Sequence, residues 1–324
     1  MRISVLGSGT WGTTLGMLLD KKGHEVTLWS FFDEEIKQMH EKKEHKFLPG
    51  IKISESIKLT SNLDDAVDCD MLVLAVPSHV VKLTCQSLKK YNDLPLIVNV
   101  AKGFEEETNE RLSVVIKKEL NKDCVVLSGP THAEEVSKGI PSAIVAASKN
   151  INDAKIVQET FGCETLRVYT NTDVVGVEIS GALKNVIALC AGISDGSGFG
   201  DNTKAALMTR GIKEISRLGV SLGGNLETFM GLTGIGDLIV TCTSMHSRNR
   251  RAGILIGQGK SLDEAIKEVG MVVEGVKSCL CAKKIADSAG IEMPIVNTAY
   301  DVLYNGISPK DAVKTLMMRE TKAE

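Results

Sequence analysis

The chain lacks the cysteine and histidine patterns of a metal-binding protein. Its eight cysteines are scattered, no C-x-x-C pair occurs, and no histidine lies at metal-ligand spacing from two cysteines. Several cysteines lie inside apolar segments such as residues 124–127, where a reduced cysteine is simply a small hydrophobe. We therefore predict no bound metal and a cytoplasmic, reducing location.

A strong charge imbalance and a targeting segment are also missing. The net charge of −3 and the isoelectric point near 6.1 argue against nucleic acid as a general partner. One basic cluster, Arg248, Arg250 and Arg251, is the exception, and short charge runs of this kind are usually solvated helix faces. The first apolar strand begins at Ile3, which leaves no room for a signal peptide.

One long apolar segment covers residues 174–193. A membrane span needs about 20 such residues. However, Glu178, Lys184 and Asn185 lie near its middle, and spans seldom carry such side chains. We expect a helix buried between two domains, and not a membrane-spanning one.

A glycine pattern stands at the start of the chain. Residues 3–6 form an apolar strand signal, and Gly7, Gly9 and Gly12 follow it in G-x-G-x-x-G spacing before a helical segment. The first glycine permits a tight turn, the second lets backbone approach a pyrophosphate, and the third lets helix and strand pack closely. This context predicts a dinucleotide-binding site and not merely a glycine-rich turn.

Two domains follow from the order of the patterns. Apolar, strand-like runs alternate with helical segments through the first half, which predicts an α/β domain with a parallel sheet over residues 1–172. From residue 173 to 324 the patterns are helical, with a capping box at Ser261 and an N-cap at Ser308. The expected fold is a doubly wound parallel sheet followed by an all-helical domain.

Lys184 is the most suggestive single residue for chemistry. It lies in the apolar helix, and Glu178 stands about 240° around that helix, too far to neutralise it locally. Apolar surroundings disfavour the charged form of an amine and bring it closer to proton exchange at neutral pH. The bland alternative is a lysine that extends its ammonium to the surface.

A second candidate site combines Gly234–Asp237, Thr241 and Ser247–Arg250. The block Ser247–Arg250 combines arginine and asparagine at a loop-to-helix junction. Forked donors and helix N–H groups suit a small anion such as phosphate.

Seven blocks occur in an order and spacing that are similar to one family. They are Gly7–Gly12, Ala101–Gly103, Ser128–Thr131, Ala182–Asn185, Asp201–Lys204, Gly236–Leu238 and Ser247–Arg250. From residue 1 to about 317, the chain resembles the NAD(P)-dependent sn-glycerol-3-phosphate dehydrogenases of the bacterial soluble type. The resemblance implies a Rossmann-type domain followed by a helical substrate domain.

The resemblance also implies roles for individual residues. Lys184 matches the lysine that exchanges the proton of the C2 hydroxyl, and Lys102 and Asp237 complete the catalytic group. The positions that match substrate-binding residues are Lys102, Gly129, Thr131, Lys184, Asp237, Ser247, Arg248 and Asn249. The positions assigned to the cofactor are Gly7, Gly9, Thr10, Trp11, Gly12, Phe31, Lys102, Ala133, Arg248, Val272 and Glu274. The family mostly reduces dihydroxyacetone phosphate and so supplies glycerol phosphate for membrane lipids.

The chain departs from the family after its second strand. Many relatives carry an arginine there that can grip the 2′-phosphate of NADP, whereas this chain has Phe31, Phe32 and Asp33. The phenylalanines could stack on adenine or pack inward, and Asp33 lies slightly late for a ribose contact. The choice between NAD and NADP therefore stays open.

Two other functions compete with this interpretation. One is a two-domain dehydrogenase of a 2-hydroxy acid or of ketopantoate, and the other is a non-catalytic regulator that binds the cofactor. The Ser247–Arg250 block favours a phosphate-bearing small molecule, and the presence of Lys102, Lys184 and Asp237 argues against a decayed enzyme. The sequence leaves the oligomeric state open, a homodimer included.

Overall fold

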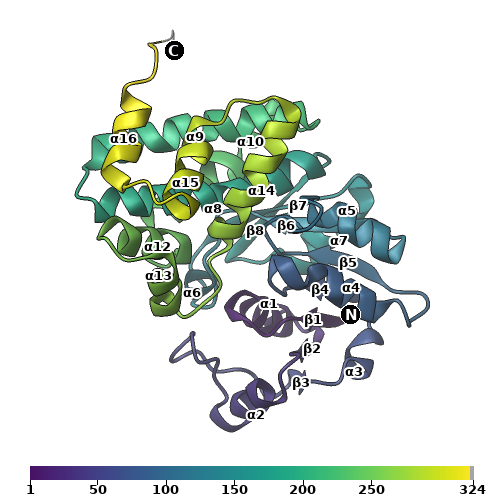
Figure 1. Cartoon of the computed structure of the whole chain (residues 1–324). Helices are drawn as coiled ribbons and strands as arrows, with labels where there is room; N and C mark the ends of the chain where they lie inside the picture. The colour runs from purple at the N-terminus through teal and green to yellow at the C-terminus, as the bar shows by residue number, and fades with distance from the viewer. Residues whose placement is uncertain (322–324) are drawn as a thin grey trace. The chain divides into compact units, whose positions relative to one another are not determined.

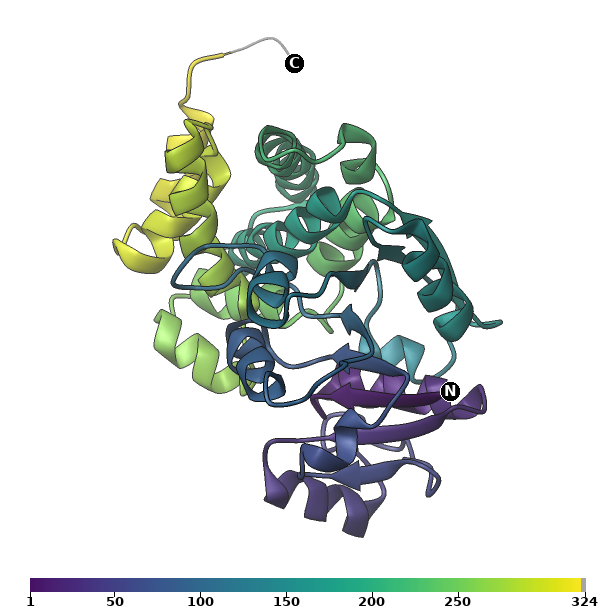
Figure 2. The same cartoon turned by 90° about the vertical axis from the view of Figure 1, so that its right-hand side faces the viewer.

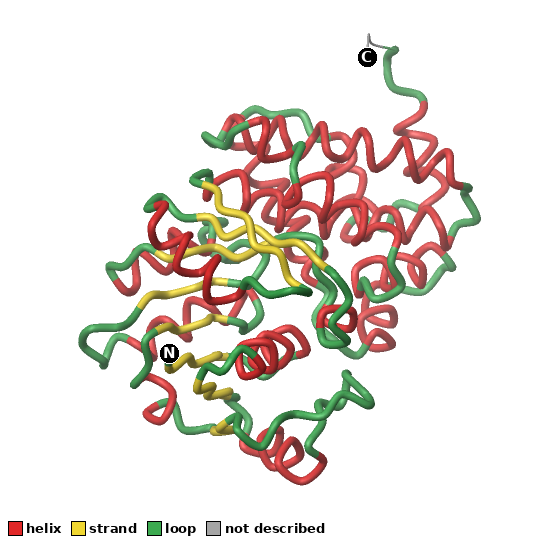
Figure 3. Tube along the Cα trace, turned by 180° about the vertical axis from the view of Figure 1, so that it is seen from behind, coloured by secondary structure: helices red, strands yellow, loops and turns green. Residues whose placement is uncertain are grey.

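The computed structural model describes residues 1–321, which form two compact units. The first unit comprises Met1–Glu105 and Glu110–Val174. The second comprises Glu106–Asn109 and the chain from Val175 onward. In Figure 3 the strands lie in the first unit, and the second unit is built from helices and loops.

One eight-stranded sheet forms the centre of the first unit. Its strand order is β3-β2-β1-β4-β5-β6-β7-β8, in which the first six follow the doubly wound arrangement (Figure 1). The predicted α/β fold is thus confirmed. The strands are β1 (Arg2–Leu6), β2 (Glu25–Trp29), β3 (Lys58–Thr60), β4 (Met71–Leu74), β5 (Leu96–Asn99), β6 (Cys124–Ser128), β7 (Ser142–Ala147) and β8 (Leu166–Asn171).

The sheet differs from the expectation in the direction of one pair. β7 runs antiparallel to β6, while every other neighbouring pair is parallel. A parallel neighbour is usually reached through a crossover that contains a full α-helix, but the segment between these two strands, residues 129–141, contains only the four-residue helix α6 (Ala133–Val136). The sequence pattern also missed the three-residue strand β3 and the strand β8. In β8, buried Leu166 and Val168 alternate with exposed Arg167 and Tyr169.

Helices cover both faces of this sheet. On one face of the sheet α4 packs with α5, and on the opposite face α1 packs with α7 (Figures 1 and 2). The central strands are continuously apolar because they are buried on both sides; Leu6, Leu72 and Val98 are completely inaccessible to solvent. Besides α6, the helices of this unit are α1 (Thr10–Lys21), α2 (Asp33–Lys42), α3 (Asp64–Val67), η1 (Ser78–Val80), α4 (Val81–Leu88), α5 (Leu112–Leu120) and α7 (Ile151–Phe161).

The second unit is helical throughout its described part. The caps expected from the sequence are confirmed, because Ser261 and Glu264 form a capping box and Ser308 caps the last helix. The helices are α8 (Val174–Gly196), α9 (Asp201–Ser221), α10 (Leu226–Phe229), η2 (Leu232–Gly236), α11 (Asp237–Thr243), α12 (Arg248–Gly257), α13 (Leu262–Val269), α14 (Glu274–Ala289), α15 (Pro294–Tyr304) and α16 (Pro309–Met317).

Helix α8 is long and apolar enough to cross a membrane by length and composition. However, 89% of its most apolar 18-residue window is buried inside the protein. That degree of burial is typical of a core helix, whose apolar surface is covered by other parts of the chain.

Glycines let α8 and α12 approach each other at backbone distance. A Cβ added to Gly253 on α12 would overlap the carbonyl oxygen of Leu189 on α8, and one added to Gly192 would overlap that of Arg250. The pairing of Gly196 with Ile254 and of Gly257 with Ile193 extends the same contact. The position of α12 therefore depends on the absence of side chains along this crossing.

A buried carboxyl group joins α9 to α15. Glu214 is 5% exposed and accepts hydrogen bonds from the backbone N–H of Ile295, at 2.8 Å, and of Val296. These bonds satisfy the free N–H groups at the start of α15. Burial nevertheless raises the pKa of Glu214 to about 7, against the lowering effect of those N–H groups.

Stability should therefore depend on pH through Glu214. Because folding raises the pKa of this carboxyl group above its ordinary value of 4.5, its contribution to stability is complete below about pH 4.5 and is lost as the pH rises through about 7. Glu214→Gln removes this ionisation. We therefore expect its free energy of unfolding, measured relative to that of the natural chain, to be higher at pH 8 than at pH 5 by up to about 3 kcal/mol. Denaturant titrations at both pH values measure the difference, with the exposed Asp287→Asn as control. An equal difference at both pH values would contradict the assignment.

Filling the helix crossing should also destabilise the second unit. We expect Gly253→Ala to lower the free energy of unfolding by about 1–3 kcal/mol, because neither backbone can yield to the added methyl group without moving α12. Gly200→Ala is the matched control, since a Cβ there meets nothing within 4 Å. Thermal unfolding of both variants tests this, and an unaltered melting temperature for Gly253→Ala would show that the crossing is loose.

Candidate active site

The glycine fingerprint has the backbone geometry that a dinucleotide requires. Gly7 has a φ of +118°, and a Cβ added there would lie 2.6 Å from the carbonyl of Ala75. A Cβ on Gly12 would overlap the carbonyl oxygen of Gly7, so only glycine lets α1 begin this close to β1. At Gly9, by contrast, a Cβ would project into open space, in front of a helix start that has no side-chain cap. The residues present therefore fit a pyrophosphate held at the start of α1.

Several other predicted positions gather after β5 and β6. The Lys102 Nζ donates a hydrogen bond to the carbonyl oxygen of Gly129 at 3.1 Å, and the backbone N–H of Thr131 donates to the same oxygen at 2.9 Å. The buried hydroxyl oxygen of Ser128 has no hydrogen-bond partner in the part of the chain that the structure describes. Ala133 begins α6, and its carbonyl oxygen accepts from Thr14 of α1 at 3.4 Å. The structure thus groups these residues at the carboxyl ends of parallel strands, where doubly wound folds bind ligands.

The aromatic positions of the first unit differ in exposure. Trp11 is partly buried and packs against the core of the sheet. Phe31 and Phe32 are 76% and 64% exposed, so neither packs inward. Phe31 contacts Trp29 and Phe32 edge to face.

In the second unit, Lys184 is held by two groups from α11. Its Nζ lies 2.5 Å from Oδ1 of Asp237 and donates to Oγ1 of Thr241 at 2.8 Å. Lys184 is 7% exposed and Asp237 1% exposed, so the ion pair is buried. The ammonium of Lys184 therefore does not extend to the surface, which excludes the alternative of a solvated surface lysine. Its neutralising charge comes from a residue 53 positions away, and this charge opposes the effect of desolvation on the amine.

Sequence reasoning grouped Thr241 with Asp237 but assigned it no catalytic or binding role. The signal was its spacing, because Thr241 follows Asp237 by one helical turn and shares its face of α11. Its hydroxyl also donates to the backbone oxygen of Asp237 at 2.6 Å, which leaves its lone pairs to accept from Lys184.

The start of α12 combines capping with polar side chains. Ser247 caps the helix by accepting from the N–H of Arg250 at 3.2 Å. The guanidinium group of Arg250 donates to Oδ2 of Asp195 through Nε at 3.0 Å and Nη2 at 2.7 Å. Asp195 also pairs with Lys204 at 2.8 Å. Arg250 therefore anchors α12 to α8, and the basic cluster is not simply a solvated helix face.

Asn249 ties three helices together. Its Nδ2 donates to Oδ1 of Asn185 at 3.0 Å, and its Oδ1 accepts from the N–H of Gly275 at 2.8 Å. Asn185 directly follows Lys184 and was not among the predicted residues. Glu274, predicted to contact the cofactor, is the first residue of α14, and Val272 precedes that helix.

The predicted residues thus fall into two groups. In the first unit are the fingerprint, Phe31, Lys102, Gly129, Thr131 and Ala133, and in the second are Lys184, Asp237, Ser247, Arg248, Asn249, Val272 and Glu274. Within residues 1–321, no three histidine, cysteine, aspartate or glutamate side chains are grouped to hold a metal ion.

A doubly wound sheet with this fingerprint and a buried, carboxylate-paired lysine are the elements of a dinucleotide-dependent oxidoreductase. Sequence models of the N-terminal and C-terminal parts of NAD-dependent glycerol-3-phosphate dehydrogenase match residues 2–154 and 173–314. The chain belongs to this family. It is therefore an NAD(P)-dependent oxidoreductase that acts on a CH–OH group.

Individual relatives agree with this. A Clostridium perfringens protein named glycerol-3-phosphate dehydrogenase (NAD(P)+) is 54% identical over 327 residues, which cover 100% of this chain and 99% of the relative. One of the same name from Thermoanaerobacter is 53% identical over 330 residues, with 100% and 99% coverage. The crystal structure of glycerol-3-phosphate dehydrogenase from Coxiella burnetii superposes with a TM-score of 0.95 at 34% identity, covering 98% of this chain and 99% of that one.

Proposed function

We propose that this protein interconverts sn-glycerol 3-phosphate and dihydroxyacetone phosphate, with Lys184 as the residue that moves the proton at the C2 oxygen. The observation that carries the proposal is the Lys184 amine, buried in an apolar helix and held by Asp237 and Thr241 at 2.5 and 2.8 Å. Such a fixed amine has little freedom to reorient, which is the positioning that proton transfer needs. Bound NAD(P) supplies the hydride acceptor or donor.

The ion pair suits the reducing direction in particular. The Asp237 carboxylate favours the ammonium form of Lys184, because an opposite charge nearby stabilises a charged group. When C2 of the ketone receives a hydride, negative charge develops on its oxygen; the ammonium stabilises that charge and then donates its proton. In the oxidising direction the same amine, in its neutral form, takes the proton from the C2 hydroxyl. The reducing direction would supply glycerol phosphate to phospholipid synthesis.

The phosphate group would bind at the start of α12. Arg248 is the first residue of that helix, after the Ser247 cap. Asn249 uses its Oδ1 and one of its two Nδ2 hydrogens in the bonds to Gly275 and Asn185, so the second Nδ2 hydrogen can donate to a ligand. A guanidinium group and helix N–H groups are well suited to a phosphate dianion. Remote binding of the phosphate would align C2 for reaction.

The other predicted residues keep their proposed roles. Lys102, held at the Gly129 carbonyl, would contact both cofactor and substrate. Substrate contacts are also proposed for Gly129 and Thr131, and cofactor contacts for Gly7, Gly9, Thr10, Trp11, Gly12, Phe31, Ala133, Arg248, Val272 and Glu274.

One assay separates this function from its alternatives. Oxidation of NADH or NADPH that depends on dihydroxyacetone phosphate supports the proposal and excludes a non-catalytic regulator. Turnover of ketopantoate or another non-phosphorylated keto acid in its place would favour the second dehydrogenase class. We also propose a cytoplasmic location, which the eight free thiols suit.

Removing the Lys184 amine should abolish turnover but preserve cofactor binding. We expect Lys184→Ala to lower kcat by about 1,000-fold or more, since a positioned proton donor is lost. Steady-state kinetics and nucleotide titration measure the two properties separately. Lys260→Ala, at a partly exposed lysine of the same unit that pairs with Glu268, is the control. A near-normal kcat in Lys184→Ala would refute the role.

Arg248→Ala should chiefly weaken substrate binding. We expect the KM for dihydroxyacetone phosphate to rise about 10- to 100-fold, which is the value of a charge-assisted hydrogen bond to phosphate. Arg251→Ala, at a partly exposed side chain one turn further along the same helix, should leave KM within about twofold. Equal KM values in the two variants would argue against phosphate binding by Arg248.

A further inference from the structure

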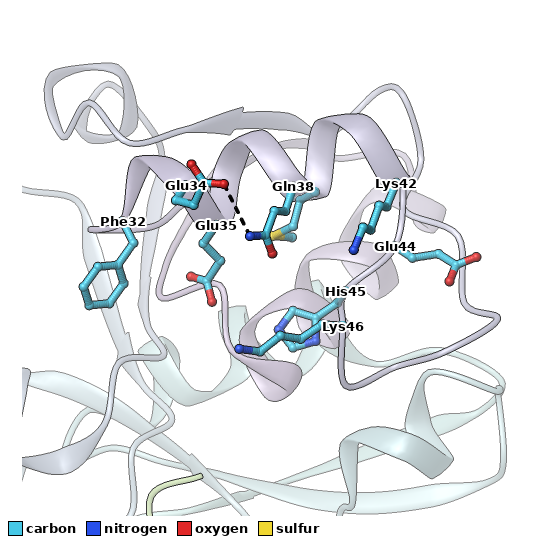
Figure 4. A pocket seen from close by; sticks show the side chains of 9 residues that line it. Phe32, Glu34, Glu35, Gln38, Lys42, Glu44, His45 and Lys46 are labelled. Carbon is cyan, nitrogen blue, oxygen red and sulfur yellow. Dashed lines mark hydrogen bonds between the residues drawn. The ribbon is translucent and has the colours of Figure 1, made fainter. Parts of the chain in front are cut away.

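A pocket of about 370 Å³ lies in the first unit, beside the end of β2. Figure 4 shows Glu35 projecting into it from α2, with Phe32 at one end and His45 and Lys46 on the facing segment. Its lining residues are Phe32, Glu34, Glu35, Gln38, Met39, Lys42, Glu44, His45 and Lys46.

Glu35 connects this pocket to the glycine fingerprint. Its Oε2 accepts a hydrogen bond from the hydroxyl of Ser8 at 2.5 Å and from that of Ser30 at 2.6 Å. Ser8 lies between Gly7 and Gly9, Ser30 directly follows β2, and the two serines are only 2% and 3% exposed. The carboxylate is therefore held in one place, and Oε1 keeps its accepting capacity because the described residues give it no hydrogen bond.

The place where Glu35 is held has a known meaning in doubly wound folds. An acidic residue about 20 positions beyond the glycines, at the end of the second strand, accepts the 2′-hydroxyl of the adenosine ribose. Asp33 is nearer to this spacing, but it is exposed, and no hydrogen bond of its side chain is found among residues 1–321. Glu35 is the acidic side chain that the fold joins to the fingerprint loop.

We infer that Glu35 accepts the ribose 2′-hydroxyl through Oε1 and makes this chain select NAD(H) over NADP(H). A 2′-phosphate in the same place would bring two negative charges against a carboxylate that its serine donors prevent from turning away. The inference concerns the dinucleotide site and does not depend on the proposed catalytic role of Lys184.

The cationic groups near Glu35 do not form an obvious phosphate site. Burial lowers the pKa of His45, although the charge of Glu35 opposes this, so the imidazole is neutral at physiological pH. Glu44 is paired with Lys52 at 2.8 Å. Lys42 and Lys46 also line the pocket. The Lys46 ammonium lies over the ring of Phe47, 4.6 Å from its centre, and is a cation that can compete for a 2′-phosphate. Lys46 therefore belongs in the test.

Binding measurements test the inference without any substrate. Purified protein is titrated with NADH and, separately, with NADPH, and Kd is taken from the change in nucleotide fluorescence. We expect the natural chain to bind NADH at least about 10-fold more tightly, because a charge-assisted hydrogen bond is gained with one nucleotide and a repulsion is met with the other. Equal affinities, or tighter binding of NADPH, would overturn the inference.

The variants identify the residue responsible. Glu35→Gln keeps the size and one accepting oxygen but removes the charge, so we expect the ratio of the two Kd values to fall about 10-fold or more, mainly by tighter binding of NADPH. Glu34→Gln, at the neighbouring acidic residue, should leave the ratio unchanged. Lys46→Ala should not weaken NADH binding. An unchanged ratio in Glu35→Gln, with a normal melting temperature, would contradict the assignment, as would a preference lost in Lys46→Ala.

Discussion

The buried pair of Lys184 and Asp237 is the constraint on which the second unit depends. The two opposite charges are removed from water between packed apolar helices. This desolvation costs several kcal/mol per ion unless close pairing and further hydrogen bonds offset it. Thr241 supplies one of those bonds, and the pair distance is 2.5 Å. Loss of either partner would leave an unpaired charge in the interior, so α8 and α11 must keep their register. A buried ion pair that gives little net stability thereby fixes the position of the Lys184 amine.

The glycine crossing of α8 and α12 extends this order to the neighbouring polar residues. Because backbone meets backbone at Gly192 and Gly253, α12 cannot slide along α8 without a collision. The start of α12 is then held by Arg250 on Asp195 and by Asn249 on Asn185. The close packing of α8 on α12 thus also fixes the hydrogen bond between Asn249 and Asn185, and Asn185 directly follows Lys184.

The first unit uses the same principle at its fingerprint. Gly7 and Gly12 let the strand, turn and helix approach without side chains, and Ser8 between them is free to bind Glu35 from a different element. Pyrophosphate binding needs only backbone and is common to all such folds. Discrimination at the ribose needs a side chain from α2, so general recognition and selectivity have separate structural origins.

The sequence by itself determined the strands β1, β2, β4, β5, β6 and β7, the glycine turn, the caps at Ser261 and Ser308 and the family, because these signals are local and repeat over a few residues. Only the tertiary structure decided the antiparallel pairing of β6 with β7, the existence of β8, the partnership of Lys184 with Asp237 and Thr241, and the contact of Glu35 with Ser8. Those features join segments far apart in the chain, and Ser8 and Glu35 are 27 positions apart. Periodicity identifies a face or an element, but which distant charges meet depends on how helices and strands pack.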